Sequence, residues 1–158
     1  MVIMHKAVEG VTAPALERFL RRAGRAAGAP GPVNVLLTSS REIRGLNRSF
    51  RGRDKPTDVL SFPPPSGMAK ELAGDIAISV DIAAANARRY GHTAAQELKI
   101  LLLHGLLHLA GYDHESDGGE MARREDRLRK MLGLAGGLIR RTHVARPLAA
   151  ANARRRKP

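Results

Sequence analysis

Three histidines within eleven residues are the strongest chemical signal in this sequence of 158 residues. His104 and His108 stand four residues apart in a leucine-rich segment, so on a helix both imidazoles project from one face. Gly111 then breaks the helix, and the turn that follows can bring His114 back beside them. Three neutral imidazoles suit one divalent metal ion and leave it an open coordination position. Zinc in such a site lowers the pKa of a bound water from about 15.7 to about 7.

A different interpretation treats these histidines as core residues that each make one backbone hydrogen bond. A buried ring nitrogen without a partner costs about 1–3 kcal/mol, so satisfying three of them separately is harder than sharing one cation. The chain has no cysteine, so any metal must be held by histidine, aspartate or glutamate. We expect one ion per chain, with Zn2+ favoured, although nickel and copper also accept imidazole ligands.

The spacing of residues 104–114 is H-x-x-x-H-x-x-G-x-x-H, which is the ligand pattern of the metzincin proteases. Those peptidases place a glutamate directly after the first histidine to accept a proton from water, whereas Gly105 has no side chain. Cleavage of a phosphodiester needs stabilisation of extra charge on the phosphoryl oxygens more than a base of that kind. The pattern therefore favours a metal-assisted nuclease over a zinc peptidase.

The elements that must position these side chains follow from periodicity and turn residues. The helix predicted at 93–110 opens with Thr93 and Gln96 at the spacing of a capping box. From Leu98 onward it is apolar nearly all round, which is typical of a central buried helix. Asp81 is the expected N-cap of a helix that reaches Tyr90. The other predicted elements are helices at 14–25, 41–50 and 118–132, and strands at 33–38, 57–62 and 74–80, the last half buried with Ile76, Ile78 and Val80 on one face. Helices mixed with three or four strands predict an α+β or α/β domain.

The helix predicted at 41–50 separates an arginine face from an apolar face. The arginines step by three and four residues along it: Arg41, Arg44, Arg48 and Arg51. They either attract RNA electrostatically or keep an exposed helix soluble. Asp58, near the start of the next strand, either orients Arg51 or a histidine, or serves as a turn residue.

Glu125 lies on the stripe of the 118–132 helix that is expected to face inward, where a carboxylate needs a partner. It either accepts a ring N–H from a ligand histidine or pairs with an arginine. Asp113 is expected to shape the turn that carries His114. His5, His92 and His143 have no such surroundings in the sequence and are expected at the surface.

The net charge of +12 is unevenly distributed. All 15 acidic residues lie at or before residue 126, whereas residues 134–158 hold seven basic residues and no acid. We interpret 134–158 as a flexible basic C-terminal extension that contacts phosphates or only increases solubility.

An aromatic content of 3% disfavours base stacking on a sheet of exposed rings. The start has no long apolar stretch, and the apolar run 100–110 is too short for a bilayer, so we expect a cytoplasmic protein without membrane contact.

Taken together, residues from about 33 to 133 resemble the bacterial YbeY family of single-domain, metal-dependent endoribonucleases. The matching blocks are LNRSFR at 46–51, KPTDVLSF at 55–62, GDI at 74–76, HGLLHLAGYDH at 104–114, and Met121 with Glu125. The chain departs from the family in having Phe50 where tyrosine is common, a proline-rich loop after Phe62, and the basic extension.

The resemblance implies an α+β, zincin-like single domain at residues 1–133, with a small mixed four-stranded sheet, about five helices and the metal motif on a central buried helix. It implies that His104, His108 and His114 bind zinc, and the family's functional arginine falls on Arg51, which we expect on the scissile phosphate.

The function implied by the resemblance is cleavage of single-stranded RNA. It includes processing of the 3′ end of 16S rRNA, and late ribosome maturation and quality control with ribosome or small-subunit proteins as partners. The alternative is a non-catalytic, RNA-binding ribosome assembly factor with a structural metal.

Overall fold

The computed structural model describes residues 1–65 and 72–134. The elements in chain order are β1 (Val2–Met4), α1 (Ala13–Ala27), β2 (Val33–Thr38), α2 (Ser40–Arg51), β3 (Val59–Phe62), β4 (Gly74–Ser79), α3 (Val80–Tyr90), α4 (Ala94–Leu109) and α5 (Glu120–Met131). Their bounds lie within a few residues of those expected from periodicity, as for the strand predicted at 33–38 and the helix predicted at 93–110. Of the predicted basic extension, residues 135–158 lie outside the described residues.

One mixed sheet has the strand order β1-β2-β4-β3. β1 and β2 are parallel, as are β2 and β4, whereas β3 runs antiparallel to β4. This four-stranded sheet with five helices is the predicted small α+β domain. The structure adds the strand at Val2–Met4, which the sequence did not locate because three residues are too few to show alternation.

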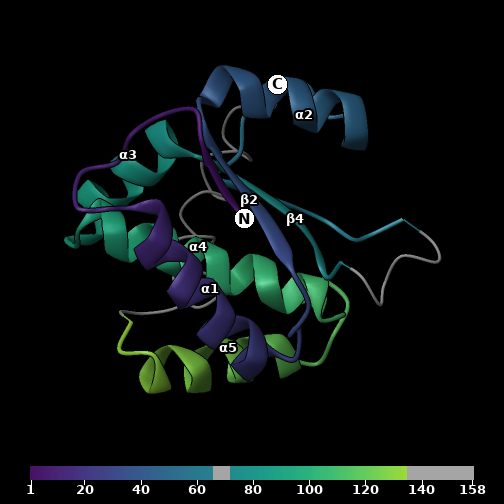
Figure 1. Ribbon diagram of the computed structural model, residues 1–158. Coiled ribbons are helices and arrows are strands. Elements are labelled where there is room, and N and C mark those ends of the chain that lie inside the picture. The colour runs from purple at the N-terminus through teal and green to yellow at the C-terminus, as the bar shows by residue number, and fades with distance from the viewer. Residues whose placement is uncertain (66–71, 135–158) are drawn as a thin grey trace, which may run out of the picture.

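The helices cover both faces of the sheet (Figure 1). α2 lies on one face, where Ile43 packs on Leu60 and Ala77 in a small cluster. α1 and α4 lie on the other face with α5 packed against them, and this side holds the main core. Within the described residues no helix has both the length and the apolar character needed to cross a bilayer.

Two local predictions about β4 and α3 are wrong. The strand is buried on both faces rather than one, because α4 packs on Ile76 on one side of the sheet and α2 covers Ala77 on the other. Ser79, not Asp81, caps α3, and its hydroxyl accepts the backbone N–H of Ile82 (3.2 Å). The Asp81 carboxylate instead accepts hydrogen bonds from the Lys6 ammonium (2.6 Å) and the Ser40 backbone N–H (2.9 Å).

α4 is the central helix of the fold, and it packs closely on β3 and β4 at Gly105. A Cβ atom at this position would lie 3.0 Å from both Ile76 Cδ1 and Ser61 Oγ. The Ser61 hydroxyl also donates a hydrogen bond to the Gly105 carbonyl (3.2 Å). Glycine at 105 therefore lets the histidine-bearing helix approach the sheet, and a glutamate side chain has no space there.

We expect Gly105→Val to destabilise the protein by about 1–3 kcal/mol, because the added atoms overpack the contact with Ile76. The matched control is Gly45→Val on α2, since a Cβ there meets nothing within 4 Å and the helix-propensity change from glycine to valine, which slightly favours valine, is the same in both variants. Urea unfolding followed by circular dichroism measures both. Equal stability of the two variants would contradict the close approach at Gly105.

Candidate functional site

The three histidines of the 104–114 motif converge at the C-terminal end of α4. His104 and His108 come from consecutive turns of the helix, and their ring centroids are 4.7 Å apart. The His114 centroid lies 5.3 Å from that of His104 and 5.4 Å from that of His108. One nitrogen from each ring can be chosen such that all three lie within 4.8 Å of one another. The structure thus brings together the predicted ligands, and their role in metal binding stays a prediction.

The bend after α4 returns His114 to the helix. Gly111 has φ +101°, a left-handed conformation that favours glycine, and the Tyr112 N–H donates to the Leu107 carbonyl (3.1 Å). The Asp113 carboxylate accepts hydrogen bonds from the Glu115 backbone N–H (3.1 Å) and the Ser116 hydroxyl (3.0 Å). Asp113 therefore shapes this turn, as predicted.

Two acceptors fix the ring orientations of the helical histidines. Glu125 on α5 lies 2.9 Å from His104 Nδ1, and the carbonyl oxygen of Tyr112 lies 3.0 Å from His108 Nδ1. The Tyr112 carbonyl can only accept, so Nδ1 of His108 carries the proton, and as acceptor of the other hydrogen bond the Glu125 carboxyl group places the proton of His104 on Nδ1 as well. Of the two alternatives for Glu125, the structure selects the hydrogen bond to a histidine of the trio.

The Nε2 atoms left free by this arrangement face each other. Nε2 of His104 and Nε2 of His108 are 3.1 Å apart, and His114 Nδ1 is buried without a hydrogen-bond partner in the described residues. Burial lowers the pKa of His108 and of His114 below the ordinary histidine value; the charge of His104 lowers both further, and that of His114 adds to the lowering at His108. The rings of His108 and His114 are therefore neutral near pH 7, and unprotonated nitrogens in close contact repel each other unless a cation lies between them. The donor set fits a metal ion.

The histidines line one side of a cleft of about 580 Å³. Arg51, at the C-terminal end of α2, also lines this cleft, and its Nη2 donates a hydrogen bond to the Ser61 carbonyl (3.3 Å). The wall also includes Asp58, which accepts the Val59 backbone N–H (2.8 Å) and makes no hydrogen bond to Arg51 or a histidine in the described residues. Asp58 is therefore a turn residue, the second of its two predicted roles.

The other arginines of α2 lie outside the lining of this cleft. Arg44 forms an exposed ion pair with Asp54 through Nε (2.9 Å) and Nη2 (3.2 Å). Arg41 and Arg48 are exposed. A role for these three in attracting RNA stays a prediction.

One of the remaining histidines is not at the surface. The His92 side chain is 12% exposed, and its Nε2 lies 2.8 Å from Oε1 of the fully buried Glu97. The prediction failed because α4 begins at Ala94, two residues after His92, and Glu97 in its first turn holds the His92 ring. His5 is exposed as predicted, and His143 lies outside the described residues.

The cleft also contains contacts that reasoning from the sequence missed. The Tyr112 carbonyl that orients His108 is a backbone atom, and no residue type signals it. The Ser61 carbonyl that holds Arg51 is a second such group. The blocks at 46–51 and 55–62 belong to one family pattern, but the sequence did not predict the contact between Arg51 and Ser61.

Fold and site together define a small α+β domain with three imidazoles and an arginine in one cleft, and comparisons with known proteins place it more narrowly. The family model of endoribonuclease YbeY matches residues 2–133. The chain is 55% identical to endoribonuclease YbeY of Koribacter versatilis (90% of this chain, 91% of the relative) and 48% identical to that of Solibacter usitatus (89% and 92%). A solution structure of a protein from Thermotoga maritima aligns with a TM-score of 0.58 and 34% identity over 84% of this chain and 90% of that one. The chain belongs to the endoribonuclease YbeY family.

Proposed function

We propose that this chain is a metal-dependent endoribonuclease that cleaves single-stranded RNA in the cleft between Arg51 and the three histidines. The observation that carries the proposal is the convergence of three ring nitrogens beside a guanidinium group in one cleft. Family membership supports RNA as the substrate, since the relatives carry the name endoribonuclease.

His104, His108 and His114 would hold one divalent cation per chain. When bound, the cation acts as a Lewis acid that neutralises charge developing on the phosphoryl oxygens. Imidazole ligands favour zinc, and nickel and copper accept the same donors. The hydrogen bonds that His104 and His108 donate to Glu125 and to the Tyr112 carbonyl keep both helical rings in the tautomer that presents Nε2 to the cleft.

Arg51 would bind the scissile phosphate. A guanidinium stays charged at any physiological pH and donates two parallel hydrogen bonds to phosphoryl oxygens. Within the described residues Arg51 makes one side-chain hydrogen bond, to the Ser61 carbonyl, so its other N–H groups can reach a substrate. The hydrogen bond to the Ser61 carbonyl holds the Arg51 side chain on the wall of the cleft.

The proposed cellular role is processing of rRNA at the 3′ end of 16S rRNA, together with late ribosome maturation and quality control in the cytoplasm. Small-subunit proteins or the ribosome itself would be the partners. The resemblance to the YbeY family and the basic composition support this role.

Removal of the metal separates this proposal from a non-catalytic assembly factor with a structural metal. We expect a chelator to abolish cleavage of single-stranded RNA and to leave the far-ultraviolet circular dichroism unchanged, because the main core is built from side chains of the sheet, α1 and α4. Addition of zinc should restore cleavage. Unfolding on chelation would favour the structural metal, and casein turnover that vanishes with chelation would favour a peptidase.

We expect Glu125→Gln to weaken metal binding by about 10–100-fold, because the amide no longer provides the charged acceptor that orients His104. Competition with a chromophoric chelator measures the affinity. The control is Glu120→Gln, an exposed acid in the first turn of the same helix, which should bind metal as the wild type does. Equal affinities of wild type and both variants would show that Glu125 has no part in the metal site.

A further inference from the structure

The exposed face of α1 carries four arginines whose charges are not neutralised within the described residues. Arg18, Arg21, Arg22 and Arg25 are all exposed, and no guanidinium among them donates a hydrogen bond or forms an ion pair in residues 1–65 and 72–134. Their spacing of three and four residues places them on consecutive turns, over about 10.5 Å of helix. We call these four residues the α1 arginine face.

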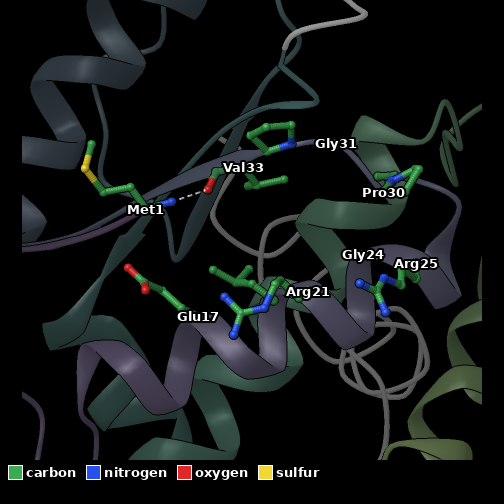
Figure 2. A pocket seen from close by; sticks show the side chains of 11 residues that line it. Met1, Glu17, Arg21, Gly24, Arg25, Pro30, Gly31 and Val33 are labelled. Atoms are coloured by element: carbon green, nitrogen blue, oxygen red, sulfur yellow. Dashed lines mark hydrogen bonds between the residues drawn. The ribbon is translucent and has the colours of Figure 1, made fainter.

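Two hollows flank the α1 arginine face. One, of about 490 Å³, lies between α1 and residues 29–33, with Arg21 and Arg25 on one wall and the apolar side chains of Leu20 and Pro30 in its lining. Figure 2 shows Glu17, Arg21 and Arg25 on α1, facing Met1 and Val33 across this hollow.

The acid in this hollow has a partner of its own, since Oε1 of Glu17 accepts the Val2 backbone N–H (3.1 Å). The second hollow, of about 620 Å³ and open to solvent, is lined by all four arginines and Ala26. Arginines outnumber acids in the lining of both hollows.

The α1 arginine face ends beside the cleft. Arg25 precedes Gly28 by three residues, or about 4.5 Å of helix. A Cβ atom on Gly28 would lie 4.0 Å from Cβ of Ala110, and the next residue, Gly111, lines the cleft. Arg25 is therefore the arginine of this face nearest to Gly28, and an RNA strand that left the cleft over Gly111 would meet it before the other three.

We propose that the α1 arginine face is a second binding surface for single-stranded RNA, which holds the strand outside the cleft. The inference rests on the proposed ribonuclease function. Four like charges on adjacent turns repel and destabilise the helix, so a polyanion is their natural complement. Guanidinium groups would bind phosphates, and the apolar lining at Leu20 and Pro30 would accept a sugar or base. RNA is favoured over an acidic protein because the α1 arginine face begins beside the cleft in which RNA would be cut, so one strand could occupy both.

The test measures RNA affinity as a function of salt, with divalent cations chelated so that the RNA stays intact. For single strands, log K falls with log salt by about 0.7 per phosphate contact, so Arg21→Gln/Arg25→Gln should reduce the slope by about 1.4 and glutamine at all four positions by about 2.8. The matched control is Arg88→Gln/Arg127→Gln, which removes the same charge from exposed positions that line neither hollow. Its slope should stay close to that of the wild type.

A second measurement compares cleavage of a long RNA with that of an RNA of a few nucleotides that fills only the cleft. The α1 variants should lower the ratio of kcat/KM for the long RNA to that for the short one, and thermal unfolding should show unchanged or increased stability. Equal salt slopes in the α1 and control variants would overturn the inference. Binding of polyglutamate, which stands for an acidic protein, is measured in the same variants. Loss of polyglutamate binding without loss of RNA binding would also overturn the inference. If the wild type cuts neither RNA, the proposed function fails, while the slopes still decide the role of the α1 arginine face.

Discussion

His114→Ala is expected to reduce cleavage of single-stranded RNA by three orders of magnitude or more. Loss of a single group that stabilises the transition state already costs about 10²–10³ in rate, and this variant removes one of three proposed metal ligands as well. The fold should be kept, because His114 lies on the bend after α4 and is only partly buried, whereas His104 is 6% exposed on the central helix. For that reason His114 is a cleaner test than His104.

The measurements are single-turnover cleavage of a single-stranded RNA, metal content of the purified protein, and circular dichroism. His5→Ala is the matched control, since His5 is exposed and paired with Glu42 away from the cleft. We expect this control to cleave RNA at the rate of the wild type. Full activity of His114→Ala with normal metal content would reject the site.

The fold was predictable where one element carries a periodic signal long enough to be unambiguous. The leucines of α4 predicted a buried helix, and the four-residue spacing of His104 and His108 then fixed their common face. Glu125 was placed correctly on the inward stripe of α5 by the same reasoning. In each case the local geometry of a helix determines the direction of the side chain.

The failures have a different physical origin. β1 is too short to show a period, and it is a strand because β2 offers it a parallel partner. Ser79 and Asp81 are both suitable N-caps, and the choice depends on Lys6 and Ser40, which lie far away in the sequence and bind the Asp81 carboxylate. Burial of His92 follows from packing of helices, which a single sequence does not specify.

Within the cleft, the residue types were predictable and the orienting backbone groups were not. Three imidazoles and an arginine can be recognised by type and spacing. The carbonyl oxygens of Tyr112 and Ser61 that hold His108 and Arg51 belong to the course of the main chain. Gly105 was identified by the side chain it lacks, and the structure adds the reason, because the helix touches the sheet there.

Arg51→Ala is expected to lower kcat for RNA cleavage by about 10²–10³, with metal affinity unchanged. The guanidinium lines the same cleft as the histidines and is hydrogen-bonded to β3 through the Ser61 carbonyl, so a phosphate bound there would meet it as charge develops. Arg51→Lys should recover only part of the loss, because an ammonium cannot donate two parallel hydrogen bonds to a phosphoryl group.

The control for Arg51→Ala is Arg53→Ala. Arg53 is exposed, lies two residues after Arg51 and does not line the cleft, so this variant removes the same charge outside the site. Steady-state kinetics separate the two possible roles of Arg51. A fall in kcat with little change in KM means that Arg51 acts on the phosphate as charge develops in the transition state. An unchanged kcat with a raised KM would instead assign Arg51 to substrate binding alone, and catalysis would then depend on the histidine trio and its metal without the arginine.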